Sequence, residues 1–243
     1  MTYIKSNKPL ISIITVVYNG VNEIEKTINS ILEQDYDNFE LIIIDGNSND
    51  GTQNMVEKYK SKIEYYISEK DKGIYDAMNK GIKACKGTWV NFMNSGDVFH
   101  NSSVLSNVFT DNNSLNQYSL IYGYKYTNDK KSIPSNLQVL EKGIIMANHQ
   151  SMFFNKNKLQ EELYYDLRYP IYGDYELVNR IFIKYGKEFF KYLDLPIANY
   201  QGGGISSFIS YQKRKDKYLI LLRHYGMFSL ISSLMYSFKQ GVK

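Results

Sequence analysis

The first half of the chain alternates short apolar runs with segments of helical periodicity. Four apolar runs have the length and the β-branched content of buried strands, and they cover 11–17, 39–44, 63–67 and 88–92. Apolar residues recur at helical spacing in the segments between them, which cover 22–34, 52–59 and 74–85. This β-α-β-α-β-α-β series predicts an α/β fold of the doubly wound kind, with a mostly parallel sheet, right-handed crossovers and flanking helices.

The pattern in the second half is less regular. We expect strands at 119–126, 149–154 and 189–193, helices at 103–109 and 174–185, a loop or weak strand at 130–140, and a flexible loop at 202–204. No internal repeat or low-complexity linker interrupts the 243 residues. The chain is therefore expected to form one α/β domain, or one such domain with a small appendage.

Polar residues follow three of the predicted strands at their carboxyl ends. The first strand runs into Tyr18, the second into Asp45, and the fourth into a turn that ends at Asp97. Because the carboxyl ends of parallel strands meet at one edge of a sheet, this placement predicts a ligand crevice there.

Positive charge is concentrated at the C-terminal end. The net charge is +4, but 213–243 holds seven of the 29 Lys and Arg residues and one of the 25 acidic residues, so this tail carries +6 and the rest −2. A nearly neutral body with a basic, apolar tail favours an anionic membrane surface as partner, and it argues against nucleic acid. The uncharged run at 225–238 is too short to span a bilayer. As alternatives, this helix docks on the protein's own core or pairs with a second copy in a homodimer.

The single cysteine, Cys85, excludes an intramolecular disulfide and fits a reducing compartment. The apolar run at 10–17 is short and no small-residue cleavage site follows it, so we expect no signal peptide. The predicted location is the cytoplasm, with peripheral contact at the inner face of the cell membrane.

The predicted nucleotide fold lacks both common phosphate-binding glycine motifs. The turn after the first strand, 18–23, is not G-x-G-x-x-G, and the sequence contains no G-x-x-x-x-G-K-[ST]. Another group must neutralise a bound diphosphate, and a divalent cation held by a carboxylate would do so.

Three blocks in this order resemble the family 2 glycosyltransferases. They are 12–19 (SIITVVYN), 40–52 (ELIIIDGNSNDGT) and 71–82 (DKGIYDAMNKGI), and the third is similar to a branch that builds bacterial surface polysaccharides. The resemblance implies a GT-A fold and inverting transfer from a nucleotide-diphosphate sugar. It places the catalytic domain at 1–212, with a nucleotide-sugar half at 1–110 and an acceptor half at 111–212. A basic amphipathic segment follows at 213–243.

The resemblance also assigns residues to the donor. It implies that Thr15 and Tyr18 line the base pocket, that Asp45 accepts a hydrogen bond from the uracil imide, and that Asp71 contacts the nucleoside. It also assigns Asn94 and His149 to the binding of the nucleotide sugar.

The metal ligand and the base follow from two further motifs. The metal motif of the family, D-x-D or D-x-D-D, is reduced here to Asn94-Ser95-Gly96-Asp97, so Asp97 is expected to hold Mn²⁺ or Mg²⁺. Inverting transfer needs a base opposite the leaving group, and Asp174 matches the second acid of the family's pair, with Gly173 in place of the first. Glu176 is the alternative base.

The sequence therefore predicts a metal-dependent inverting glycosyltransferase. It would move a hexose or N-acetylhexosamine from a UDP-sugar to a saccharide, lipid-linked in our prediction, in the assembly of capsule, O-antigen or exopolysaccharide. Two alternatives stay open: a GDP-sugar transferase of the same family, and an inactive partner of a polysaccharide synthase complex. A nucleotidylyltransferase is disfavoured, because it requires a glycine-rich basic loop where 18–23 stands.

Overall fold

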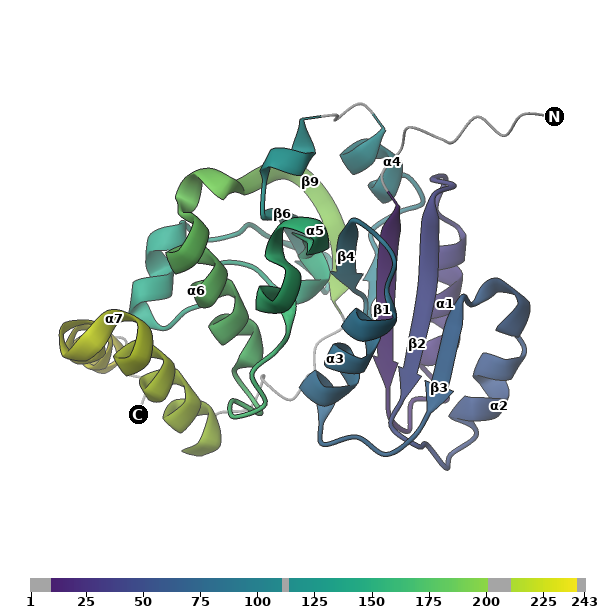
Figure 1. Ribbon diagram of the computed structural model, residues 1–243, viewed down its shortest axis with the longest axis horizontal. Coiled ribbons are helices and arrows are strands. Elements are labelled where there is room, and N and C mark those ends of the chain that lie inside the picture. The colour runs from purple at the N-terminus through teal and green to yellow at the C-terminus, as the bar shows by residue number, and fades with distance from the viewer. Residues whose placement is uncertain (1–9, 111–113, 201–210, 240–243) are drawn as a thin grey trace.

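The computed structural model describes residues 10–110, 114–200 and 211–239, with the side chains of 236–239 left out. One mixed sheet runs through the molecule with helices on both faces (Figure 1). Its strand order is β3-β2-β1-β4-β8-β6-β9-β5, with β7 beside β6. The strands are β1 (Ile11–Val17), β2 (Phe39–Asp45), β3 (Tyr65–Ser68), β4 (Trp89–Phe92), β5 (Val98–Phe99), β6 (Leu120–Thr127), β7 (Lys130–Ser132), β8 (Met152–Asn155) and β9 (Phe190–Tyr200).

Two hydrophobic cores lie on opposite faces of the sheet. Successive side chains of a strand point to opposite faces, so Ile13 enters one core and Ile14 the other. The Ile13 core is covered by α1 (Ile24–Leu32), α2 (Thr52–Glu57) and α4 (Val104–Phe109). The Ile14 core is covered by α3 (Ile74–Ala84), α6 (Gly173–Tyr185) and part of α7 (Tyr211–Lys239). A short helix, α5 (Lys156–Leu159), follows β8.

The parallel order predicted from the first half is confirmed for β3, β2, β1 and β4. Beyond β4 the sheet becomes mixed, because β8 pairs antiparallel with both β4 and β6. Strand β9 then runs parallel to β6 and antiparallel to β5. The expectation of a mostly parallel sheet therefore describes only one side of the molecule.

Two predictions in the second half are wrong in ways that affect the cavity described below. Only part of 149–154 is a strand, because His149–Ser151 forms a 3₁₀ turn, η4, before β8. The polar side chains of this turn are thereby directed differently from those of a strand. Strand β9 extends to Tyr200, well beyond the expected end at 193. The loop expected at 202–204 lies outside the described residues.

The C-terminal helix α7 has two parts separated by a kink. Gly226 has φ 76° and ψ −172°, which are not helical angles. Before the kink, Ile220 and Leu221 are fully buried in the core beside α6, and the buried Asp216 carboxylate accepts hydrogen bonds from the backbone N–H groups of Ile171 and Tyr172. This part of the C-terminal segment therefore docks on the protein's own core, which is one of the alternatives predicted from the sequence.

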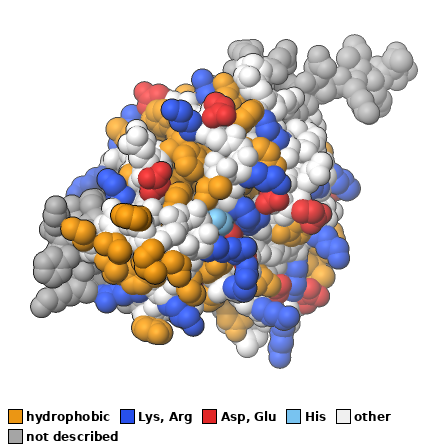
Figure 2. All heavy atoms as spheres, turned by 60° about the vertical axis from the view of Figure 1, so that its left-hand side comes forward, with side chains coloured by type: hydrophobic (Ala, Val, Ile, Leu, Met, Phe, Trp, Pro, Cys, Tyr) orange, Lys and Arg blue, Asp and Glu red, His pale blue; other side chains and the backbone are white. Residues whose placement is uncertain are grey.

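Beyond the kink, α7 presents apolar side chains to the outside. The exposed fractions are 59% for Met227, 91% for Phe228, 50% for Ile231, 45% for Leu234 and 60% for Met235. Hydrophobic side chains gather on the face of the molecule that carries this helix (Figure 2). None of the helices within the described residues combines the length and apolarity needed to cross a bilayer.

Candidate active site

A cavity of about 710 Å³ opens at the carboxyl ends of β1 and β4. Its walls come mainly from the end of β1, the start of α3 with the loop before it, the turn after β4, η4, the start of α6 and the end of β9. It therefore lies where the sequence predicts a crevice. Six of the eight predicted site residues line it, namely Tyr18, Asp71, Asn94, Asp97, His149 and Asp174.

The other two predicted residues, Thr15 and Asp45, are fully buried and do not line the cavity. The Asp45 carboxylate accepts hydrogen bonds from the Ser48 N–H at 3.0 Å and from the hydroxyls of Ser48 and Ser68. The Ser48 hydroxyl in turn accepts the N–H of Asn19, a cavity residue, at 2.7 Å. In this structure Asp45 thus supports the cavity wall through Ser48, and its contact with a base stays a prediction.

Asp97 sits in the turn that follows β4, with 7% of its surface exposed. The turn requires Gly96, whose φ is 101°, and the Thr27 hydroxyl fixes it by donating to the Asp97 carbonyl at 2.8 Å. The Gln150 side-chain amide donates to Asp97 Oδ2 at 2.6 Å. Burial raises the pKa of the Asp97 carboxyl, while Gln150 and the charges of His149 and Lys125 act in the opposite direction.

The oxygen atoms near Asp97 fit a divalent cation that is shared with a substrate. Within the part of the chain that the structure describes, no three His, Cys, Asp or Glu side chains form a metal cluster. Asp97 is one carboxylate, and the buried Ser95 hydroxyl in the same turn has no hydrogen-bond partner. Mg²⁺ is commonly bound by one or two carboxylates together with substrate phosphates, so these oxygens suit a cation completed by a diphosphate. When bound, the cation would offset the negative charge of that diphosphate.

Asp174 lies in the first turn of α6, where the helix dipole favours a negative charge. His149 Nδ1 is 2.8 Å from Asp174 Oδ2, while the buried Oδ1 has no hydrogen-bond partner. The Asp174 N–H donates to the Tyr75 hydroxyl at 3.3 Å. A Cβ atom at Gly173 would come within 2.7 Å of the Tyr75 ring. Tyr75 thus occupies the space next to Gly173.

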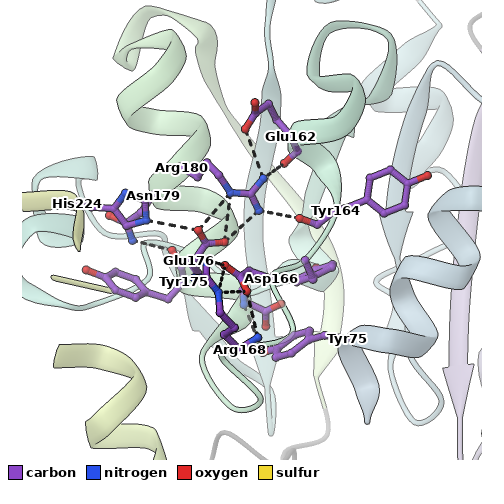
Figure 3. A network of polar contacts seen from close by, with 12 residues as sticks. Tyr75, Glu162, Tyr164, Asp166, Arg168, Tyr175, Glu176, Asn179, Arg180 and His224 are labelled. Atoms are coloured by element: carbon purple, nitrogen blue, oxygen red, sulfur yellow. Dashed lines mark hydrogen bonds and ion pairs between the residues drawn. The ribbon is translucent and has the colours of Figure 1, made fainter. Parts of the chain in front are cut away.

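Glu176, the alternative base, is fully buried and does not line the cavity. Arg180 Nη2 donates to Glu176 Oε2 at 3.0 Å, and His224 Nε2 is 3.4 Å from Oε1. Burial would raise the pKa of Glu176, but the hydrogen bonds and charges of His224 and Arg180 lower it. Figure 3 shows Arg180 held between Glu176 and Glu162. Glu176 therefore serves the packing of α6 and α7.

Sequence reasoning missed two residues that shape the site, Gln150 and Tyr75. Both line the cavity. The Gln150 side chain donates a hydrogen bond to the Asp97 carboxylate, and the Tyr75 hydroxyl accepts the N–H of Asp174 at the start of α6. A signal for Gln150 was present, because a polar triplet, 148–150, interrupts the apolar pattern just before β8. Tyr75 gave no such signal, since its ring reads as an ordinary apolar residue of α3.

The sequence of this chain is similar to those of known glycosyltransferases. The sequence matches the family described as glycosyl transferase family 2 over residues 12–166. An uncharacterized glycosyltransferase of Rickettsia felis is 35% identical over 127 residues, which cover 51% of this chain and 21% of that protein. The chain thus spans about a fifth of the length of this relative. A PGL/p-HBAD biosynthesis glycosyltransferase of Mycobacterium bovis is 26% identical over 207 residues, covering 83% of this chain and 80% of that protein.

Solved structures show the same fold at low sequence identity. S. aureus TarS 1–349 in complex with UDP-GlcNAc matches with a TM-score of 0.72 and 17% identity, over 94% of this chain and 72% of that one. A mannosyltransferase from Pyrobaculum calidifontis in complex with GDP-Man and Mn²⁺ matches with a TM-score of 0.64 and 14% identity, over 96% and 76%. The family match covers more than half of the sequence. The chain therefore belongs to glycosyltransferase family 2, has a GT-A type fold and is a glycosyltransferase.

Proposed function

We propose that this protein is a metal-dependent inverting glycosyltransferase that moves a hexose or N-acetylhexosamine from a UDP-sugar to a saccharide hydroxyl. The observation that carries the proposal is that Asp97 and Asp174, from distant parts of the chain, line one cavity. Asp97 is suited to a diphosphate-bound cation, and the partly exposed Asp174 carboxylate is suited to accept a proton. The fold neighbour TarS, whose structure holds UDP-GlcNAc, supports the choice of donor.

The cavity supplies the groups that such a transfer needs. The Tyr18 ring is 68% exposed at its wall and offers a stacking face for the nucleobase. Asp71 lies on the same wall, positioned for the nucleoside. Asp97 would hold Mn²⁺ or Mg²⁺, and that cation would offset the negative charge of the departing diphosphate. Asp174 removes the proton of the acceptor hydroxyl during in-line attack at the anomeric carbon.

A donor screen tests this proposal directly. The full chain is incubated with UDP- and GDP-sugars and Mn²⁺, and the released nucleotide is identified by mass. We expect release of UDP in the presence of acceptor, and thermal stabilisation by UDP with Mn²⁺ in excess of that by GDP. A preference for GDP would instead favour the second candidate, for which the GDP-Man-bound neighbour is the supporting observation. No turnover with any donor would favour an inactive partner of a synthase complex.

We further propose that the acceptor is lipid-linked and that α7 brings the enzyme to an anionic membrane surface. The exposed apolar side chains of Met227, Phe228, Ile231, Leu234 and Met235 lie on the part of α7 beyond the kink and are here called the α7 apolar face. Lys213, Arg214 and Lys215 lie in the part of α7 before the kink, and their positive charge would add attraction to anionic lipid. Surface polysaccharide assembly, as of capsule or O-antigen, is the corresponding pathway class.

Vesicle sedimentation distinguishes the occupants of the α7 apolar face. Phe228→Glu is expected to weaken binding to phosphatidylglycerol vesicles at least tenfold, because it places a charge in the apolar face. Tyr65→Glu is the matched control, since Tyr65 is 40% exposed on β3, the edge strand on the opposite side of the molecule from α7 (Figure 1). Absence of vesicle binding by the unaltered protein, together with a dimer that Phe228→Glu dissociates, would assign the face to a second copy.

A further inference from the structure

Three side chains form a continuous hydrogen-bonded chain along the cavity wall. Asn94 Nδ2 is 2.9 Å from His149 Nε2, and His149 Nδ1 is 2.8 Å from Asp174 Oδ2. Asn94 follows β4, His149 begins η4, and Asp174 begins α6, so the chain connects three elements that are separate in the sequence. It runs from the turn that holds Asp97 to the predicted base.

Chemistry fixes the direction of both hydrogen bonds. An ionised carboxylate only accepts, so the proton between His149 and Asp174 is on Nδ1. In the neutral ring Nε2 is then an acceptor, and the Asn94 amide donates to it. One tautomer of His149 therefore satisfies both neighbours. The chain occupies Oδ2 of Asp174 and leaves the buried Oδ1 without a partner.

The surroundings of His149 and Asp174 restrict both side chains. The exposed fractions are 13% for the His149 side chain and 22% for that of Asp174. Burial lowers the pKa of His149, but the charge and hydrogen bond of Asp174 raise it more strongly, and Asp97 and Lys125 act with opposite signs at longer range. Burial raises the pKa of the Tyr165 hydroxyl, and the nearby Asp174 carboxylate raises it further.

We propose that His149 is a positioning residue: by holding Oδ2 it fixes the orientation in which the Asp174 carboxylate takes the acceptor proton, while Asn94 fixes the tautomer of His149. This inference rests on the proposed role of Asp174 as base. In the transfer step the acceptor O–H proton moves to the Asp174 carboxylate, and the acceptor oxygen bonds to the anomeric carbon. The bond from that carbon to the diphosphate oxygen breaks, and the diphosphate leaves with the electron pair. His149 keeps its Nδ1 proton throughout.

Two substitutions of His149 separate positioning from simple packing. In His149→Asn the amide nitrogen takes nearly the position of Nδ1 and can still donate to Asp174. In His149→Gln the amide nitrogen takes nearly the position of Nε2, so Asp174 loses its donor. We expect kcat within about tenfold of the unaltered enzyme for His149→Asn and a fall of about 10²-fold for His149→Gln, in line with the contribution of a positioned base. The donor KM and the thermal stabilisation by UDP with Mn²⁺ are expected to be unchanged in both.

Other outcomes would overturn the inference. Equal losses in the two variants would make His149 a packing residue, and a loss confined to the donor KM would make it a donor contact. If His149→Gln does not fold, Asn94→Ala replaces it. This change leaves the Nδ1 bond but frees the tautomer, and we expect a five- to tenfold loss of kcat; no loss would contradict the proposal.

A double variant distinguishes failure of this inference from failure of the proposed base. Without the carboxylate there is nothing left for His149 to position, so His149→Gln should cause no further loss of kcat in an Asp174→Asn background. An additional loss of the same size would refute positioning through Asp174. If Asp174→Asn alone is as active as the unaltered enzyme, the base assignment fails and the positioning role fails with it. An inactive Asp174→Asn beside two unaffected His149 variants would refute positioning alone.

Discussion

Two acidic residues in the first turn of α6, Asp174 and Glu176, lie in different environments and have different roles. Asp174 faces the cavity with one oxygen held by His149 and the other unpartnered. Glu176, two residues later, is fully buried with its oxygens bound to Arg180 and close to His224. A carboxylate that is partly exposed at a cavity wall is available for chemistry, whereas a fully buried one whose charge is paired serves the packing of its neighbours. Residue type and sequence position alone do not separate the two roles.

The largest expected effect sharpens this comparison by removing the charge of Asp174. Asp174→Asn keeps the size of the side chain but cannot take a proton from the acceptor. We expect kcat to fall about 10²- to 10⁴-fold, the contribution of a positioned general base, with UDP binding unchanged. Single-turnover transfer and thermal shift with UDP measure the two quantities. Loss of both binding and transfer would reassign Asp174 to structure.

Glu176→Gln is the matched counterpart, with the opposite expectation. It leaves the half-buried Arg180 side chain, which is 20% exposed, without its closest carboxylate. We expect the free energy of unfolding to fall by roughly 3 kcal/mol, while kcat per folded molecule stays within about twofold. Chemical denaturation and active-site-normalised kinetics provide the measurements. A selective loss of kcat in a stable protein would restore Glu176 as a catalytic candidate.

The comparison also shows what the sequence could predict. Strand β1 was predicted with the observed bounds, Ile11–Val17, because a continuous apolar run of that length has few other solutions. The start of α6 was predicted at 174 and lies at Gly173, because Asp and Glu commonly occupy the first turn of a helix. The pattern of neighbouring residues thus sufficed for element bounds that are set by interactions between residues close in sequence.

Contacts across the fold could not be predicted in this way. The hydrogen bond between His149 and Asp174 depends on η4, which replaced part of an expected strand. The burial of Asp45 depends on hydroxyls from two different segments, at Ser48 and Ser68. Each of these arrangements requires loop geometry that no periodicity encodes. Whether Thr15 and Asp45 touch a nucleotide stays a prediction.

Metal removal tests the other carboxylate of the cavity, Asp97. Because the described residues near it provide no cluster of three acidic, His or Cys ligands, a cation should bind tightly only together with a diphosphate. We expect Mn²⁺ alone to stabilise the protein weakly and Mn²⁺ with UDP to add about 2–3 kcal/mol at concentrations near 100-fold above the dissociation constant. EDTA or Asp97→Asn should abolish the increment. Strong stabilisation by Mn²⁺ without UDP would show a resident metal instead.

The smallest expected effect concerns the junction of α7 with the catalytic body. Asp166, whose side chain is 18% exposed, bonds to Arg168 and to Arg223 of α7, and these partners lower the pKa of its carboxyl to about 2. A depressed pKa contributes stability that is complete above the unfolded value near 4 and is lost as the pH falls toward 2. Because Arg168 is well exposed and screened by solvent, we expect Asp166→Asn to lower the free energy of unfolding by about 1 kcal/mol at pH 7.

The pH dependence identifies that contribution as electrostatic. The difference between Asp166→Asn and the unaltered protein should shrink as the pH is lowered from about 4 to 2, because the carboxyl becomes protonated in the unfolded state and half protonated in the folded state. Asp194→Asn is the control, since that side chain is 75% exposed, and denaturant titrations at several pH values should show no comparable difference. A destabilisation by Asp166→Asn that persists unchanged at pH 2 would mean that Asp166 acts by packing. The contact of α7 with Asp166 would then not be stabilised by charge pairing, in contrast to that of Glu176 with Arg180.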